Sequence, residues 1–409
     1  MTNKLKNVPE LRFSEFDGVW ENSKLGTVAN VYDGTHQTPK YTIEGIKFLS
    51  VENIKTLNSN KFISKEDFEK EFKIRPEFGD VLMTRIGDVG TPNIIETNED
   101  LAYYVSLALL KPKKLNSYFL ESLIRSQTVQ NELWRKTLHI AFPKKINKNE
   151  IAKVEINYPE QMEQQKIGDF FSKLDRQIEL EEQKLEKLEE QKKGYMQQIF
   201  SQQLRFKDEN GNDYPGWKEY VLGETGNTYS GLSSKTKEDF GYGDSYFITY
   251  MNVFKNTIAK ANMTEKVNIQ ENEKQNKVNY KDILFTTSSE VPEETGMSSI
   301  WLYKENNVYL NSFCFGFHVT CDDIEPIYLT RFLRSEKMRK QITILSQGST
   351  RFNISKKEVM KLKIDVPNLE EQTKIVNFLS EYDSLIEKQS SKIGVLKQRK
   401  KGFLQKMFV

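Results

Sequence analysis

Apolar residues recur at alternating steps of four and three positions in two long stretches of the chain, residues 159–202 and 367–409. A repeat averaging 3.5 residues that persists for several heptads is typical of a coiled-coil seam. The seam positions are Ile167, Phe171, Leu174, Ile178, Leu185 and Leu188 in the first stretch, and Ile375, Leu379, Ile386, Ile393, Leu396 and Phe403 in the second. Each stretch begins with a proline, which suits the start of a helix. We therefore predict two long helices.

The two stretches are copies of one another. KKGYMQQIF at 192–200 returns as KKGFLQKMF at 400–408, and Pro159 and Pro367 have the same offset, 208 residues (367 − 159). A match without insertion over this length is what a continuous helix would impose. Polar residues interrupt both seams at the same two steps, and polar seam positions fix the register of a coiled coil at a cost in stability. The repetition therefore predicts one specified pairing of the two helices.

The direction of that pairing follows from the chain between the helices. Each helix would be roughly 60 Å long at 1.5 Å per residue. In a parallel pair, residues 203–366 would have to return the chain along the whole rod, whereas an antiparallel pair needs no such return. The alternative of a surface helix on a globular core fits poorly with the charged run EEQKLEKLEEQKK. We predict a long antiparallel two-helix coiled coil that joins two globular domains related by a pseudo-twofold axis.

The remaining segments, 1–158 and 203–366, mix strand-like and helical patterns. IKFLSV at 46–51 and DILFTT at 282–287 are examples of the strand-like runs. This mixture predicts an α+β domain in each copy. The matches between the two segments drift in offset from 193 to 209 residues, so loops of different length separate shared elements. Such a pattern is expected when the loops carry specificity.

Composition is that of a folded protein with no charge bias. The 409 residues are 37% hydrophobic, and 29% charged residues leave a net charge of only +2. A nucleic-acid-binding face requires a local basic patch and not a basic total. The amino-terminal stretch has no apolar segment like that of a signal peptide, and no run of about 18 apolar residues occurs, so we expect a cytoplasmic protein.

Cys314, His318 and Cys321 are the candidates for a metal site. FCFGFHV alternates like a strand, which places Cys314 and His318 on the face opposite the phenylalanines, while Cys321 points the other way. No second Cys/His pair completes a tetrahedral ligand set. We predict a core or edge strand and no metal site.

Candidate DNA-binding residues lie in loops at corresponding places in the two copies. Their side chains are of the types that contact phosphates and base edges. They are His36, Gln37, Lys40, Arg85, Asn93, His139, Lys144 and Lys145 in the first copy, and Ser234, Lys235, Lys237, Ser288, Ser289, Ser349, Arg351 and Asn353 in the second. Two similar readers with different loops would suit a divided DNA sequence with different halves.

The sequence resembles a known family, the specificity (S) subunit of type I restriction–modification systems. The resemblance rests on P-x-x-x-E-Q-x-K-I-x-x-F at 159–170 and 367–378, on the Leu-Arg-Phe…Trp…Leu-Gly openings of both copies, and on the GDVLMTR-type strands. It covers essentially the whole chain. It implies two target recognition domains, 1–158 and 203–366, which each contact half of a bipartite asymmetric target, and two conserved helices, 159–202 and 367–409, which set the unread spacer.

The resemblance also implies partners. Two methyltransferase (M) subunits would use S-adenosylmethionine to methylate adenine, and restriction (R) subunits would join them, with ATP and Mg on the partner subunits and no cofactor in this chain. We expect the M subunits on the outer helix faces and on the loops near Pro159 and Pro367.

We predict no catalysis by the chain itself. The nearest strings to adenine-methyltransferase motifs, at 240–243 and 157–160, have the wrong glycine and proline spacing, and no phosphate-binding loop occurs. Two alternatives to a non-catalytic DNA-recognition subunit remain: a self-contained DNA-modifying enzyme, and a coiled-coil scaffold that binds only proteins.

Overall fold

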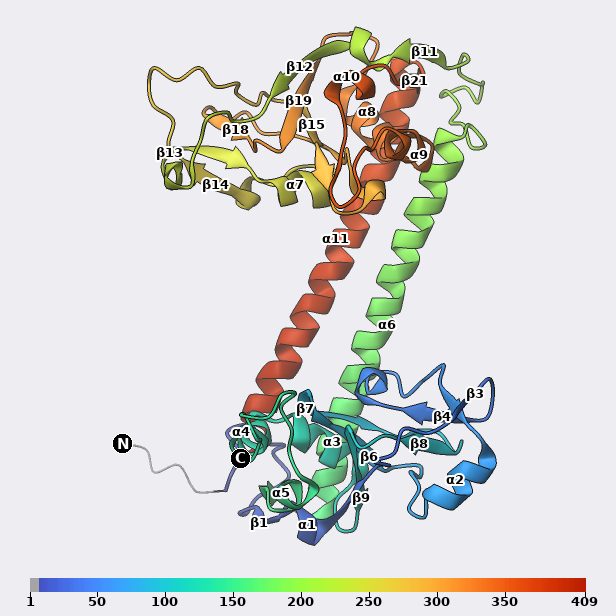
Figure 1. The fold of residues 1–409 in the computed structure, drawn as a ribbon, viewed down its shortest axis with the longest axis vertical. Helices are drawn as coiled ribbons and strands as arrows, with labels where there is room; N and C mark the ends of the chain where they lie inside the picture. The colour runs from blue at the N-terminus through green and yellow to red at the C-terminus, as the bar shows by residue number, and fades with distance from the viewer. Residues whose placement is uncertain (1–6) are drawn as a thin grey trace. The chain divides into compact units, whose positions relative to one another are not determined.

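The computed structural model describes residues 7–409, which form two compact units. The first unit combines the chain through Lys184 with Gln389–Val409, and the second is Leu185–Lys388. Each unit holds one mixed domain of helices and sheets and part of each long helix, α6 (Gln161–Phe200) and α11 (Leu369–Lys406) (Figure 1). The fold is α+β, as predicted. The division of the chain into four segments stays a prediction.

The domain of the first unit is built on two four-stranded sheets. One has the order β2 (Ala29–Asp33), β9 (Leu107–Pro112), β6 (Val81–Ile86), β7 (Asp88–Ile94), and the other β3 (Tyr41–Thr42), β5 (Phe62–Ile63), β4 (Ile46–Leu49), β8 (Leu101–Tyr103). Helices α3 (Ser117–Arg125) and α4 (Gln127–Arg135) cover β7. Val81 and Met83 of β6 enter one hydrophobic cluster and Leu82 another, so the central sheet is buried on both faces.

The second unit repeats this plan. Its four-stranded sheet has the order β12 (Gly226–Ser230), β19 (Cys314–Val319), β15 (Ile283–Thr286), β17 (Ser298–Ile300), and α8 (Pro326–Leu333) and α9 (Glu336–Ile344) correspond to α3 and α4. A three-stranded sheet joins β14 (Thr264–Val267), β13 (Phe240–Ile248) and β18 (Val308–Leu310).

The remaining α-helices and strands belong to both units. In the first unit they are α1 (Leu25–Val28), β1 (Glu21–Lys24), α2 (Lys65–Glu71), α5 (Lys148–Ala152) and β10 (Glu155–Tyr158). In the second unit they are β11 (Lys218–Val221), α7 (Tyr250–Lys255), β16 (Ser288–Ser289), β20 (Phe352–Asn353), α10 (Lys356–Val359) and β21 (Lys363–Val366).

The two long helices run antiparallel within each unit. In the first unit Asp175 of α6 pairs with Lys400 of α11, and further along α6 Glu181 pairs with Lys392, so residue numbers rise on one helix as they fall on the other. In the second unit Lys192 pairs with Asp383, at 2.5 Å, and further along α6 the ring of Tyr195 contacts that of Phe378, so the numbers again run in opposite directions. The predicted direction is confirmed within each unit.

All twelve predicted seam residues are buried or half-buried. Leu174, Ile178 and Leu396 form a small cluster of their own. Two of the interrupting polar residues pair with each other, since Gln389 Nε2 donates to Glu181 Oε2 at 2.7 Å. The carboxyl end of α11 leaves the seam and enters the first domain.

That end of α11 completes a hydrophobic core. Phe408 is 5% exposed, and its ring lies 5.7 Å from the rings of both Phe119 and Phe171 and 6.2 Å from that of Trp20. Phe200, the corresponding residue at the end of α6, packs against Tyr328 and Phe332 in the second unit. The repeated nonapeptides are thus repeated core-filling helix ends.

The repeated Glu-Gln motif joins the start of each long helix to its domain. Fully buried Glu163 accepts two hydrogen bonds from Arg12, at 2.7 and 2.6 Å, and Glu371 accepts two from Arg205, at 2.8 and 2.7 Å. The hydrogen bond to Glu163 raises the pKa of Arg12. The neighbouring glutamines, Gln164 and Gln372, each accept from a backbone N–H of the domain. The motif has a structural role in both units.

Cys314 and His318 both lie in β19, where a strand was predicted. Among the described residues, neither belongs to a group of side chains that could hold a metal ion. Cys314 is buried, which raises the pKa of its thiol, and His318 Nδ1 lies 2.6 Å from Oδ1 of buried Asp282. Within residues 7–409 no three His, Cys, Asp or Glu side chains are grouped as metal ligands would be. Over the same residues, no helix is both long and apolar enough to span a bilayer.

Candidate nucleic-acid interface

A hairpin loop in the first unit brings two of the predicted loops together. The hairpin, residues 138–145, is closed by Leu138 N–H donating to Lys145 O at 2.8 Å. Gly87, in the turn between β6 and β7, donates its N–H to Lys144 O at 2.8 Å, and Ile146 donates to Arg85 O at 3.0 Å. The loops at 84–93 and 137–145 are therefore neighbours.

Arg85 is the internal brace of this region. It is 5% exposed, forms an ion pair with Asp33 at the end of β2, and donates from Nε to Ile146 O at 3.1 Å. Burial lowers the pKa of its guanidinium. Because Asp33 directly precedes the third predicted loop, 34–40, this contact ties all three loops together. Arg85 therefore braces the loops from inside the domain, and its contact with DNA stays a prediction.

The other candidates of the first unit are mostly at the surface. His36, Gln37, Lys40, His139, Lys144 and Lys145 are exposed. Asn93 is half-buried, and its amide donates to the carbonyls of Ile54 and Lys55, at 2.8 and 3.2 Å, so it holds a neighbouring turn. Lys144 lies over the ring of Trp134 with its Nζ 4.6 Å from the centroid. The exposed group offers cations and amide or imidazole donors.

The second unit has a hairpin at the same place. Residues 347–353 are closed by paired hydrogen bonds between Gln347 and Asn353, both 2.9 Å. The hairpin pairs with the strand that follows β15, since Ser288 lies opposite Asn353, and Ile354 N–H donates to Thr287 O at 2.9 Å. The loops at 286–294 and 346–353 are thus joined as their counterparts are.

The candidates in the second unit divide in the same way. Ser234, Lys237, Ser349, Arg351 and Asn353 are exposed, and Ser289 is half-buried. Ser288 is buried and accepts a hydrogen bond from Arg351, at 3.3 Å. The side chain of Lys235 is 5% exposed and pairs with Glu273 at 2.6 Å. Like Arg85, Ser288 and Lys235 are parts of the framework.

The surfaces around the hairpins have the chemistry of a nucleic-acid interface. Lysine and arginine bind phosphates, and amide, hydroxyl and guanidinium groups read base edges in the grooves. The second unit also has a cation on an aromatic face, because the guanidinium of Arg351 lies 5.2 Å from the ring centroid of Phe313. The backbone arrangement of the two hairpins is shared and their side chains differ. Such a pair can contact DNA in equivalent ways while reading different bases.

A second shared feature is a groove between the domain and the basic carboxyl-terminal part of a long helix, which we call the helix-end groove. In the first unit it has a volume of about 340 Å³ and is lined by Pro92, Arg125, Gln130, Lys397, Lys400 and Lys401, among others. In the second unit it has a volume of about 500 Å³, and its lining includes Lys192, Lys193, Met196, Arg334 and Arg339. Arg125, Lys400 and Lys401 correspond in the repeat to Arg334, Lys192 and Lys193.

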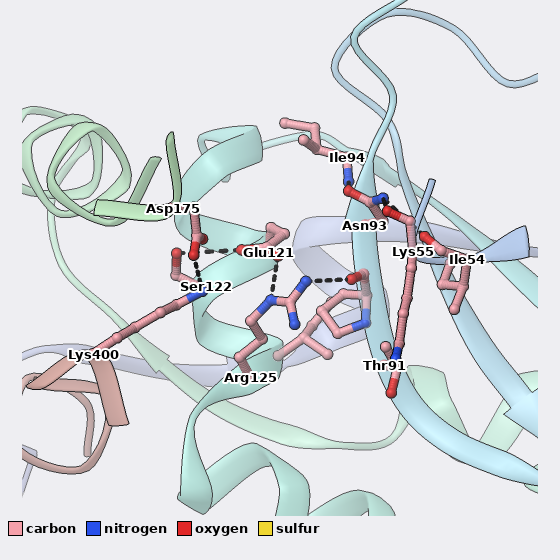
Figure 2. A network of polar contacts seen from close by, with 12 residues as sticks. Ile54, Lys55, Thr91, Asn93, Ile94, Glu121, Ser122, Arg125, Asp175 and Lys400 are labelled. Atoms are coloured by element: carbon pink, nitrogen blue, oxygen red, sulfur yellow. Dashed lines mark hydrogen bonds and ion pairs between the residues drawn. The ribbon is translucent and has the colours of Figure 1, made fainter. Parts of the chain in front are cut away.

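Figure 2 shows how the groove of the first unit is braced. Arg125 lies between Glu121, with which it pairs, and β7, where its Nη2 donates to Pro92 O at 2.7 Å. Burial raises the pKa of Glu121. Lys400 pairs with Asp175 on the neighbouring long helix. In the second unit Arg334 is held by backbone carbonyls instead, including Val253 O at 3.0 Å.

In the sequence, LIRSQ and FLRSE, at 123–127 and 332–336, indicate a repeat but no role for Arg125 or Arg334. The signal that could have found them is an arginine and a following helix-capping serine kept in both copies of otherwise diverging domains.

Comparisons with known proteins agree with one another. The family model for the type I restriction modification DNA specificity domain matches residues 18–190 and again 214–397. The MjaX type I restriction enzyme specificity subunit of Methanocaldococcus jannaschii is 25% identical over 97% of this chain and 95% of its own length.

Two solved structures share the fold. The S subunit of a type I restriction–modification system from M. genitalium superposes with a TM-score of 0.58 at 15% identity, and the match covers 98% of this chain and 99% of that one. A chain from a structural study of complex assembly and conformational transition in the type I system has a TM-score of 0.56 at 17% identity, covering 94% and 96%. With a family model matched twice over most of its length, this chain belongs to the family of type I restriction–modification DNA specificity subunits.

Proposed function

We propose that each domain of this specificity subunit reads one half of a bipartite asymmetric DNA target and that the chain performs no catalysis of its own. The observation that supports this most is the pair of hairpins, 138–145 and 347–353, which stand at the same place in the two units and carry different side chains. Shared placement gives both units the same approach to a duplex, and different side chains give each its own base preference.

In this proposal the paired long helices fix the length of the unread spacer. Partly exposed ion pairs and hydrogen bonds between them, such as that of Gln389 with Glu181, specify one register. A fixed register holds the separation of two readers constant, which a divided target requires.

We further propose that the two helix-end grooves hold two copies of one partner, the methyltransferase subunit. Arginine and two lysines are kept at equivalent positions of both grooves, whereas the hairpins have diverged. Surfaces that meet the same protein twice should stay alike, and surfaces that meet different DNA sequences should not. S-adenosylmethionine would bind the M subunits, and ATP and Mg would bind the R subunits. The outer helix faces and the loops near Pro159 and Pro367 would extend the M interface.

Sequencing of methylated bases in cells that express the complete system tests the proposal. We expect one asymmetric target with two defined halves and a spacer of constant length. With M subunits present, binding to that target should exceed binding to a scrambled duplex and should weaken steeply as salt rises, because neutralised phosphates release counterions.

Equal binding to every sequence would contradict the proposal and favour a scaffold that binds only proteins. Methyl transfer by the purified chain alone would instead identify a self-contained enzyme.

A further inference from the structure

The tip of the first unit's hairpin presents two bare apolar side chains. Ile140 is 100% exposed and Phe142 is 104% exposed, whereas most large apolar residues of the unit are packed in its cores. Exposing both side chains to water is unfavourable, because the free-energy cost is proportional to the apolar area that stays in contact with water. The exposed Leu138 and Trp134 lie at the base of the same hairpin, so apolar surface is gathered there, and such a patch marks a site for a binding partner in a way that a lone exposed residue does not.

The hairpin that carries them is firmly anchored. Its two ends are tied together by the bond from Leu138 to Lys145, and it is tied to the sheet by the bond from Gly87 to Lys144. His139 Nε2 lies 2.9 Å from Trp134 O, and Lys144 covers the indole ring. The tip therefore projects from a base with a defined geometry, and little order has to be gained when it binds.

The charge around the tip points to DNA as the partner. His139, Lys144 and Lys145 flank the two apolar residues and are exposed, and residues 138–145 contain no carboxylate. Two lysines on one side of the apolar tip and an imidazole that can hydrogen-bond on the other complement a surface on which phosphates flank stacked bases. Proteins that kink DNA commonly insert Phe, Ile or Leu between base steps in this way.

We propose that Phe142 and Ile140 insert between neighbouring base pairs of the half-site that the first unit reads, unstacking one step. The inference rests on the proposed function and names a contact that contributes to it. Because steps differ in how easily they unstack, the insertion also contributes specificity where no hydrogen bond is made to a base.

The second unit lacks this device. Its hairpin tip is Gly348, Ser349 and Thr350, which offer no apolar side chain to insert. The unstacked step is therefore confined to one half of the target, and the two halves differ in mechanism as well as in sequence.

The test uses the complex of this chain with its M subunits and a target duplex that carries 2-aminopurine at successive positions outside the methylated adenines. Unstacking raises the fluorescence of this base, and we expect a rise at one step of the first unit's half-site and at none in the other half. Phe142→Ala should abolish the rise and weaken target binding about tenfold, as loss of a base–aromatic contact does. Ile43→Ala, at an apolar residue of the same unit that is 98% exposed, is the matched control and should change neither.

The outcomes separate the inference from the proposed function. Sequence-specific binding in which Phe142→Ala changes neither fluorescence nor affinity would overturn the insertion alone. Loss of M subunits from the Phe142→Ala complex on size-exclusion chromatography, with DNA affinity retained in excess M, would assign the tip to a protein interface and also overturn it. Absence of any sequence preference in the unaltered complex would overturn the proposed function together with the insertion.

Discussion

One carboxylate of the Glu-Gln motif, Glu163 in α6 and Glu371 in α11, holds the start of each long helix to its domain. Glu163 has no exposed surface and receives both hydrogen bonds of one guanidinium edge from Arg12, a bidentate pairing that fixes distance and orientation together. Arg12 also donates to the carbonyls of Asp17 and Gly18. One arginine thus connects the amino-terminal segment of the domain to the first turn of α6, and Arg205 does the same for α11.

We expect Glu163→Ala to lower the free energy of unfolding by about 1.5 to 3 kcal/mol, because Arg12 loses two charge-assisted hydrogen bonds and keeps only those to the carbonyls of Asp17 and Gly18. Glu371→Ala should have the same effect in the second unit. Thermal and denaturant unfolding of the full chain measure both effects.

The control is Lys363→Ala, which breaks an exposed ion pair with Glu219 and should lower the free energy of unfolding by less than about 1 kcal/mol. Equal effects of Glu163→Ala and Lys363→Ala would show that the buried pair contributes no more than a surface pair.

Residue roles were the part of the site least accessible from sequence. Arg85, Lys235 and Ser288 have the chemistry of DNA contacts, and only the fold shows them turned inward to Asp33, Glu273 and Arg351. The partners of Arg85 and Lys235 lie 52 and 38 positions away in sequence, so no local pattern reveals them. Ile140 and Phe142 were visible in the sequence as apolar residues, but their complete exposure was not.

At the scale of elements, the long helices were predictable because one seam repeats along their whole length and no loop interrupts it. Their direction also followed from the chain length between them. The polar positions of the two seams could be located in sequence, but the partners of the two lysines could not. Lys192 and Lys400 pair with Asp383 and Asp175, which lie outside the seam.

The ion pairs of Lys400 with Asp175 and of Lys192 with Asp383 should respond differently when the charges within each pair are exchanged. In the first unit Lys400→Asp or Asp175→Lys alone should lower the Tm by about 2 to 5 °C, the shift for roughly 1 kcal/mol. Both together should restore most of it, because the exchange re-forms the ion pair in the opposite sense, and Glu121 interacts with both positions, attracting Lys400 and repelling Asp175. Scanning calorimetry measures each step.

The second unit supplies the contrast. Arg331, whose side chain is 1% exposed, also pairs with Asp383, at 2.7 Å, so a lysine at 383 would face a buried cation. Lys192→Asp with Asp383→Lys should therefore remain destabilised. Equal recovery in both units would contradict the part assigned to Arg331.

At the scale of the whole molecule, one strand order occurs twice in one chain, β2-β9-β6-β7 and β12-β19-β15-β17. The duplicated sequence predicted two such domains because the matched segments are the strands and helices of the shared core. The second sheet of each domain was not predictable, since it differs between the units: four strands in the first and three in the second. Divergence is concentrated in the parts that the common core leaves free to vary.

We expect exchange of residues 203–366 for the same segment of another family member to change one half of the methylated target and leave the other half intact. The reason is that each domain has its own cores and its own hairpin. Sequencing of methylated bases in cells carrying the exchanged chain gives the result directly. A change in both halves would show that the domains do not read independently.

The burial of Phe408 among Trp20, Phe119 and Phe171 has a consequence for the order of events during synthesis. The first domain leaves the ribosome long before the helix end that fills its core, because all of Leu185–Lys388 is translated in between. At roughly 5 to 20 residues per second, the nascent domain waits on the order of 10 to 40 s with an apolar socket open. A chaperone would matter most to the cell during that interval. A truncated chain, in which the core of the first domain is never filled, would expose the same apolar surface permanently.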